Sequence, residues 1–129
     1  MKNPQIFISW GELVDKITIL QIKLEHLTSQ DALNNVAREL EQLQSTFSKY
    51  CPEAIKPKLF EAELKRINQQ LWDIEDKIRN KERNKSFDAE FIRLARSVYI
   101  TNDERSRIKK VINETFGSDL IEEKSYSEY

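Results

Sequence analysis

Residues 9–27 read SWGELVDKITILQIKLEHL and carry two apolar stripes at the spacing of an α-helix. The main stripe recurs every three or four positions and consists of Trp10, Leu13, Ile17, Leu20, Leu24 and Leu27. A second stripe with the same spacing lies on the opposite side and consists of Asp15, Ile19, Ile22 and His26. Because the middle of this helix is apolar nearly all round, we expect other helices to cover it on both faces.

The start of this helix has the form of a capping box. Ser9 is placed to accept from the amide of Glu12, whose side chain would reach back toward Ser9. Ile8 and Leu13 hold the two positions of a hydrophobic staple, which sets the angle at which residues 5–8 enter the helix. We therefore expect a short extended N-terminus and a helix that begins near Trp10.

Two further helices follow on either side of a proline-bounded loop. An apolar seam over residues 33–47 predicts a second helix, which must end before Pro52. Residues 51–56 are expected to form a loop, and Pro57 suits the first turn of a third helix. The seam of this third helix covers residues 60–78, and we expect it to be the longest element.

The predicted fourth helix starts after the capping residues 86–88 and ends at Gly117, because glycine tolerates the left-handed backbone of a helix end. Its apolar seam is interrupted by Thr101 and Arg105, so a guanidinium faces the core and needs a partner. Asp15 of the first helix is a suitable carboxylate. We expect one continuous helix, whereas a break at the second capping sequence near Thr101 would create a fifth.

These patterns together predict an all-α fold, an antiparallel bundle of four helices, or five, with coiled-coil-like seams. Residues 1–129 are expected to form a single helical domain, because the chain contains no internal repeat and no linker long enough to divide it. Residues 118–129 are expected to form a polar, acidic C-terminal tail.

Composition limits the classes of partner. The chain has 21 Lys and Arg against 22 Asp and Glu, so an anionic partner must use a local patch rather than a global field. No window approaches the roughly 20 apolar residues that span a bilayer, and we expect no membrane insertion. The N-terminus lacks the apolar region of a signal peptide, and the single Cys51 has no disulfide partner, so we expect a cytoplasmic protein.

We find no sequence signature of catalysis, of a metal site or of a cofactor. His26 is the single histidine and has no nucleophile at helical spacing, and the carboxylates show no metal-ligand spacing. Glu75 and Arg79 stand four residues apart, as in an ordinary surface ion pair. We therefore expect no cofactor, and we favour a non-enzymatic role over an enzymatic one.

Polar residues also gather in the predicted fourth helix. Arg96, Tyr99 and Asp103 share one face, while Asn102 and Arg105 interrupt the apolar seam. Such residues either form a structural network that fixes the register or hold a ligand, and arginines suit a diphosphate. The cations that could contact a nucleic acid are Arg105, Arg107, Lys109 and Lys110, together with the basic end of the third helix, residues 77–85. They do not all share a face and no aromatic residues interleave them, so a nucleic-acid partner is disfavoured.

Several sequence blocks are similar to those of a known family. They are SWGEL (9–13), DKITIL (15–20), LWDIED (71–76), ARSVY (95–99), TND (101–103), GS (117–118) and EEKSY (122–126). Together they resemble a bacterial family of unknown function whose members occur beside or fused to glycosyltransferases and other surface-polysaccharide proteins. The resemblance implies a helical architecture and a polysaccharide context, and it supplies no catalytic residue.

The candidate binding residues are the side chains within these blocks, and Arg105 just after the TND block, that also stand out against the helical seams. We expect them to meet across the bundle. They are Asp15, Lys16, Trp72, Glu75, Asp76, Arg96, Tyr99, Asn102, Asp103 and Arg105.

Three functions are compatible with this sequence. The first is a helical accessory or protein-interaction domain in cell-surface polysaccharide biosynthesis, either self-associating or bound to a protein partner. The second is a small enzyme or sugar-nucleotide-binding module that holds a phosphate-bearing sugar in the Arg96, Tyr99, Asp103 and Arg105 region. The third is a nucleic-acid-binding helical protein. A concave pocket favours the second, whereas flat apolar surface favours the first.

Overall fold

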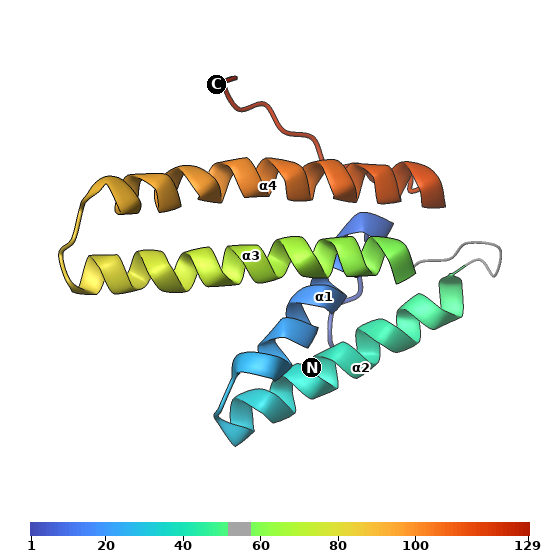
Figure 1. The fold of residues 1–129 in the computed structure, drawn as a ribbon. Helices are drawn as coiled ribbons and strands as arrows, with labels where there is room; N and C mark the ends of the chain where they lie inside the picture. The colour runs from blue at the N-terminus through green and yellow to red at the C-terminus, as the bar shows by residue number, and fades with distance from the viewer. Residues whose placement is uncertain (52–57) are drawn as a thin grey trace.

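The computed structural model describes residues 1–51 and 58–129, and these residues contain four α-helices (Figure 1). The helices are α1 (Trp10–His26), α2 (Gln30–Tyr50), α3 (Lys58–Arg83) and α4 (Ala89–Phe116). The described part of the chain contains no strand, so the predicted all-α bundle of four helices is confirmed. Pro57 and most of the predicted loop, residues 52–56, lie outside the described residues.

Of the described helices, none combines the length and apolarity that crossing a membrane requires.

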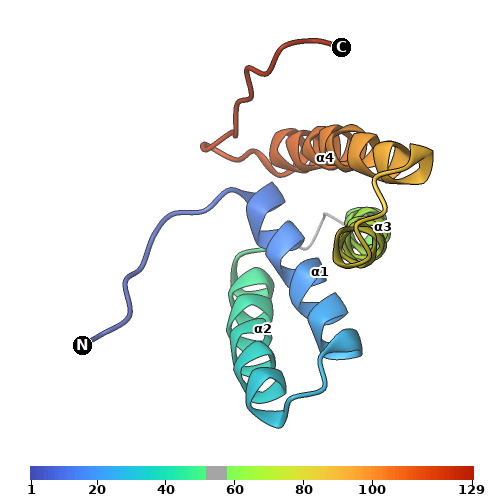
Figure 2. The same ribbon diagram turned by 90° about the vertical axis from the view of Figure 1, so that its left-hand side faces the viewer.

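The helices form two antiparallel hairpins, with α1 at the centre. α3 and α4 lie side by side, and α1 packs against α2, α3 and α4 (Figure 1). Figure 2 shows α1 between α2 on one side and the α3–α4 pair on the other. The expectation that other helices cover both faces of the first helix is therefore confirmed.

Each face of α1 has its own apolar core. The core toward α2 consists of Leu13, Ile17, Leu20, Val36 and Leu40. The core toward α3 and α4 consists of Val14, Leu64, Ile112 and Phe116. Trp10 joins the two, because its ring centroid lies 5.6 Å from that of Phe47 and 5.2 Å from that of Phe116.

The start of α1 is capped as expected, but one half of the capping box is replaced. The Ser9 hydroxyl accepts from the amide of Glu12 at 3.2 Å, and Ile8 packs against the same core as Leu13. The Glu12 carboxylate instead accepts from Lys109 of α4 at 2.7 Å. The predicted contact of the Glu12 side chain with Ser9 is thus replaced by an ion pair with Lys109, which fixes α1 to α4.

α4 runs unbroken past Thr101 and Arg105 and ends at Gly117, which has a φ of 69°, as predicted. With 28 residues it is longer than α3, which has 26, so the prediction that the third helix is the longest is wrong. α4 continues through its two polar seam residues because the packing accommodates both. Thr101 is buried, and Arg105 pairs with Asp15 of α1.

Candidate functional site

A buried ion pair between α1 and α4 forms the floor of the site. Asp15 is 0% exposed, and the Arg105 Nε donates to its Oδ1 at 2.9 Å while the Arg105 Nη2 donates to its Oδ2. The Asn68 Nδ2 of α3 donates to Asp15 Oδ1 at 2.9 Å and to Thr18 Oγ1 at 3.0 Å. The hydrogen bonds to Asp15 raise the pKa of Arg105, against the lowering effect of burial. The pairing that the interrupted seam predicted is confirmed.

Lys109 is a second buried cation, one helical turn from Arg105. Its Nζ lies 2.7 Å from a Glu12 oxygen, 3.0 Å from a Glu122 oxygen and 3.7 Å from Asp15 Oδ2. Burial by itself lowers the pKa of Lys109, but the hydrogen bonds to the two glutamates and the charge of Asp15 outweigh it, so the pKa is raised. Lys109 thereby ties α1 and the C-terminal tail to α4.

The N-terminus of α1 lies in direct backbone contact with α4. The Gly11 amide donates to Asn113 Oδ1 at 2.7 Å, and the Trp10 amide donates to Ser118 Oγ at 3.0 Å. A Cβ at Gly11 would lie 2.5 Å from the carbonyl oxygen of Lys109, closer than any side chain can sit. Glycine therefore permits the close approach that brings Asp15 under Arg105.

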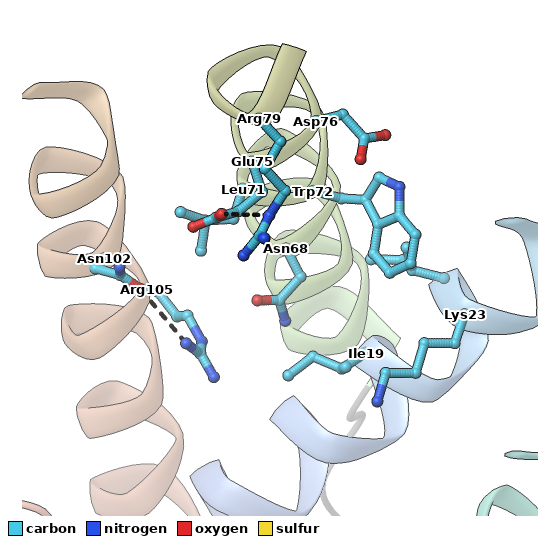
Figure 3. Close-up of a pocket in the computed structure, with 11 residues that line it drawn as sticks. Ile19, Lys23, Asn68, Leu71, Trp72, Glu75, Asp76, Arg79, Asn102 and Arg105 are labelled. Carbon is cyan, nitrogen blue, oxygen red and sulfur yellow. Dashed lines mark hydrogen bonds and ion pairs between the residues drawn. The ribbon is translucent and has the colours of Figure 1, made fainter. Parts of the chain in front are cut away.

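Above this network lies a pocket of about 490 Å³ between α1, α3 and α4 (Figure 3). Its lining consists of Ile19, Ile22, Lys23, Asn68, Leu71, Trp72, Glu75, Asp76, Arg79, Asn102 and Arg105. Apolar side chains come from α1 and α3, and charged side chains come mainly from α3. The pocket falls within the volume range of small-molecule binding sites.

Polar groups point into this pocket from α3 and α4. Figure 3 shows the Arg79 side chain of α3 and the Arg105 side chain of α4 lying in the space between the two helices. The Arg79 Nε lies 3.4 Å from Glu75 Oε2, which is the surface ion pair that the four-residue spacing predicted, and the Arg79 side chain is 76% exposed. The Arg105 Nη1 donates to Asn102 Oδ1 at 3.4 Å. Further N–H groups of both guanidiniums remain for a ligand.

Trp72 forms the aromatic wall of the pocket. Its ring stacks against that of His26 of α1, with centroids 4.9 Å apart and an interplanar angle of 18°. This contact links the end of α1 to the middle of α3 and holds the indole in place. The expectation of edge packing for His26 is met, since its ring supports Trp72 at the edge of the helical interface.

The lining carries charged, amide and aromatic groups that suit recognition of a polar ligand. The pocket residues named above include no serine, cysteine or histidine. In the described residues, no group of three or more histidine, cysteine, aspartate or glutamate side chains is placed to hold a metal ion. What the lining does provide is three cationic groups, two carboxylates, two amides and an indole.

The structure divides the ten predicted site residues into two groups. Six lie at the pocket or directly beneath it, and these are Asp15, Trp72, Glu75, Asp76, Asn102 and Arg105. The other four are Lys16, Arg96, Tyr99 and Asp103. Lys16 and Arg96 are exposed. Asp103 accepts from the Tyr129 hydroxyl at 2.6 Å, and Tyr99 packs against the Tyr129 ring, so these two face the tail.

Sequence reasoning missed the pocket residues Lys23, Asn68 and Arg79, together with the apolar Ile19, Ile22 and Leu71. Helical spacing contained a signal for two of them. Asn68 stands one turn before Trp72, and Arg79 stands one turn after Glu75, so each shares a face with a residue that was predicted. Lys23 could not be predicted in this way, because its place in the pocket depends on how α1 crosses α3.

The chain belongs to a family of unknown function (DUF6165), whose profile matches residues 4–129. Comparison with curated proteins and with solved structures gives no match. The predicted membership of a family of unknown function is thus confirmed, while the association with surface-polysaccharide proteins stays a prediction.

Proposed function

We propose that this member of a family of unknown function is a non-catalytic binding module that holds a phosphate-bearing sugar in the pocket between α1, α3 and α4. The observation that carries the proposal is that Arg79, Arg105 and Lys23 all line one pocket, which also has an indole wall. A site of this kind offers cations for an anionic group and an apolar surface for the rest of the ligand.

The phosphate is assigned to the arginine side of the pocket. A guanidinium presents several N–H donors in a planar fork that matches the oxygen spacing of a phosphate. Arg105 uses two of its nitrogens on Asp15, which leaves Nη1 toward Asn102 and the pocket. Arg79 is oriented by Glu75 through Nε, which leaves its terminal nitrogens for the ligand.

The sugar is assigned to the Trp72 side. A pyranose has an apolar C–H surface that suits an aromatic ring, and hydroxyl groups that donate to carboxylate and amide oxygens. Glu75 and Asp76 supply carboxylates on the same helix as Trp72, and Asn102 supplies an amide from α4. The polysaccharide context that the sequence resemblance implies also supports a sugar over other phosphorylated ligands.

Calorimetric titration of glucose 1-phosphate tests this proposal, with glucose and inorganic phosphate titrated separately. The sugar phosphate should bind more tightly than either part, because it uses both sides of the pocket. Arg79→Gln should weaken binding about tenfold. Arg83→Gln, one turn further along α3 and outside the pocket lining, should change the affinity less than about twofold. Equal losses in the two variants, or no heat with any of the three ligands, would contradict the proposal.

We propose self-association through an exposed face of α4 that borders α3 as a second function. Ile100 and Val111 on this helix remain 44% and 45% exposed and stand about three turns apart, so they share a face. Exposed apolar residues on one helix face suit a second helix. Light scattering should report a mass above 15.3 kDa that falls to the monomer in Ile100→Glu. A monomer at every concentration would exclude this function.

On α4, the nucleic-acid alternative loses two of its four cations. Arg105 is bound by Asp15 and Lys109 by Glu12, Glu122 and Asp15, which leaves Arg107 and Lys110 exposed. Few free cations close together cannot track a phosphate backbone, so we do not favour this role.

A further inference from the structure

The far ends of α3 and α4, with the turn between them, differ in charge from the rest of the chain. We call residues 77–96 the hairpin end. It contains seven basic and three acidic residues, whereas the whole chain has a net charge of −1. Figure 1 shows that it extends beyond α1 and α2, at the left of the view. The hairpin end is therefore a local basic projection on a molecule that is otherwise acidic.

The acidic residues of the hairpin end are already engaged by its own lysines. Lys81 Nζ lies 2.9 Å from both Asp88 and Glu90, and Lys85 Nζ lies 3.5 Å from Glu82. The remaining cations have no carboxylate partner within the described residues, and all are exposed: Lys77, Arg83, Arg93 and Arg96. The hairpin end therefore presents four cations without a carboxylate partner, while Asp88 and Glu90 share the single charge of Lys81.

Two large apolar side chains lie among these cations. Phe87 in the turn is 56% exposed, and Ile92 in the first turn of α4 is 57% exposed. The Phe87 ring packs edge to face on Phe91, with centroids 5.3 Å apart, which holds it at the end of the hairpin. The hairpin end thus combines exposed apolar side chains with exposed cations and is amphipathic; we call the turn with Phe87 and Ile92 the tip.

The turn itself holds a lysine in a conformation that favours glycine. Lys85 has a φ of 53°, and the neighbouring Ser86 amide donates to the Lys81 carbonyl at 2.9 Å. Glycine at this position would avoid the steric penalty of a left-handed backbone. A lysine there places another basic side chain at the apex, beside Phe87.

We propose that the hairpin end is a docking surface for an anionic lipid membrane. Lipid headgroups supply negative charge to the cations, and the interfacial region accepts the Phe87 and Ile92 side chains. At about 1.5 Å per residue, Lys77 and Arg96 stand roughly 10 Å from the helix ends, within one Debye length of a surface that the tip touches. This proposal is independent of the pocket and of its ligand.

A nucleic acid is the less suitable anionic partner for this surface. A phosphate backbone is contacted by cations along a track, and exposed apolar side chains in the middle of the patch gain little from it. Beyond the hairpin end, the remainder of the chain is net negative and would repel a long polyanion. A membrane surface meets only the tip, so the acidic remainder stays away from it.

Co-sedimentation of the full chain with vesicles tests the proposal. The vesicles contain phosphatidylglycerol and phosphatidylcholine in equal parts, and pure phosphatidylcholine vesicles serve as the uncharged comparison. The double variant Arg83→Gln/Arg93→Gln should bind anionic vesicles about 25-fold more weakly, at roughly fivefold per charge. The matched control is Arg38→Gln/Lys49→Gln on α2, which removes the same charge far from the tip and should lose less than about twofold.

A third variant separates the apolar contribution from the charge. Phe87→Ser leaves the charge unchanged and should weaken binding about tenfold. Circular dichroism checks that each variant keeps its helices, which the exposure of these side chains leads us to expect. Absence of binding to anionic vesicles would overturn the proposal, as would equal losses in the tip and control variants. Tip-dependent binding to a polynucleotide without binding to vesicles would overturn it in favour of a nucleic-acid surface.

Discussion

Arg105 of α4 donates to both carboxylate oxygens of Asp15, a residue 90 positions earlier that is buried completely on α1. This contact lies beneath the candidate pocket and fixes the position of α4 along α1. Because Arg105 also lines the pocket, the same side chain connects the stability of the fold to the shape of the site.

Removal of the guanidinium should destabilise the fold strongly. Arg105→Ala leaves the buried Asp15 carboxylate with Lys109, 3.7 Å away, as its remaining cation, and is expected to cost about 3 kcal/mol of unfolding free energy. The matched control is Arg66→Ala, because Arg66 is 55% exposed in its ion pair with Glu104 and should cost less than about 1 kcal/mol. Urea denaturation measures both. Similar costs for the two variants would show that the buried pair does not hold α1 to α4.

Gly11→Ala should destabilise the protein although alanine is the better helix former. In an exposed helix this change stabilises by up to about 1 kcal/mol. At Gly11 the added Cβ meets the Lys109 carbonyl oxygen at 2.5 Å and Asn113 Oδ1 at 2.8 Å, so α1 must move away from α4. We expect a net loss of about 1–3 kcal/mol, measured by thermal denaturation. A stabilised variant would contradict the close approach of the two helices.

The contact between Lys109 and the tail should appear in the pH dependence of stability. Its hydrogen bond and charge lower the pKa of Glu122 below the ordinary value of 4.5. A group whose pKa is lowered by folding stabilises above its unfolded pKa and loses this contribution as the pH falls through the folded pKa. Glu122→Gln should therefore lower the free energy of unfolding near neutral pH, by at most about 1 kcal/mol because the carboxylate is half exposed.

The difference between Glu122→Gln and the wild type should then close as the pH falls below 4.5. Glu123→Gln is the control, since it removes the same charge from the adjacent tail position. Urea denaturation at a series of pH values provides the comparison. A difference that is the same at acidic and neutral pH would place Glu122 away from Lys109 in solution.

A charge placed beside Arg105 should affect ligand binding without affecting the fold. In Asn102→Asp, a carboxylate replaces the amide oxygen that lies 3.4 Å from Arg105 Nη1. The new anion competes with the ligand phosphate, and the affinity for glucose 1-phosphate should fall about tenfold. The melting temperature should hold or rise slightly, since the guanidinium gains a partner. Unchanged affinity in a folded variant would remove Arg105 from the proposed phosphate site.

Helix boundaries and one long-range contact were predictable from the residues themselves. Seam spacing and capping residues predicted all four helices because they are local properties of each segment. The Arg105–Asp15 pair was predictable for a different reason. A guanidinium in an apolar seam must find a carboxylate, and Asp15 interrupts the second stripe of residues 9–27.

The composition of the candidate site was only partly predictable. Residues two apart on a helix point about 200° apart, so Asp103 and Arg105 could not share one pocket, and the structure places Asp103 against Tyr129 instead. The height at which Trp72 meets α1 depends on how the two hairpins cross, which is set by packing of both cores rather than by any local pattern. The acidic tail likewise gave no signal that Glu122 would bind Lys109.

The most direct test of the proposed site is an NMR titration of the two tryptophan indole N–H signals with glucose 1-phosphate. Trp72 lines the pocket, whereas Trp10 lies between Phe47 and Phe116 in the core, so the chain contains its own control. The Trp72→Phe variant assigns the signals. We predict a saturable shift of the Trp72 signal with the Trp10 signal unchanged. No shift of Trp72 at any ligand concentration, or a shift of Trp10 alone, would contradict the assignment of this pocket as a sugar-phosphate site.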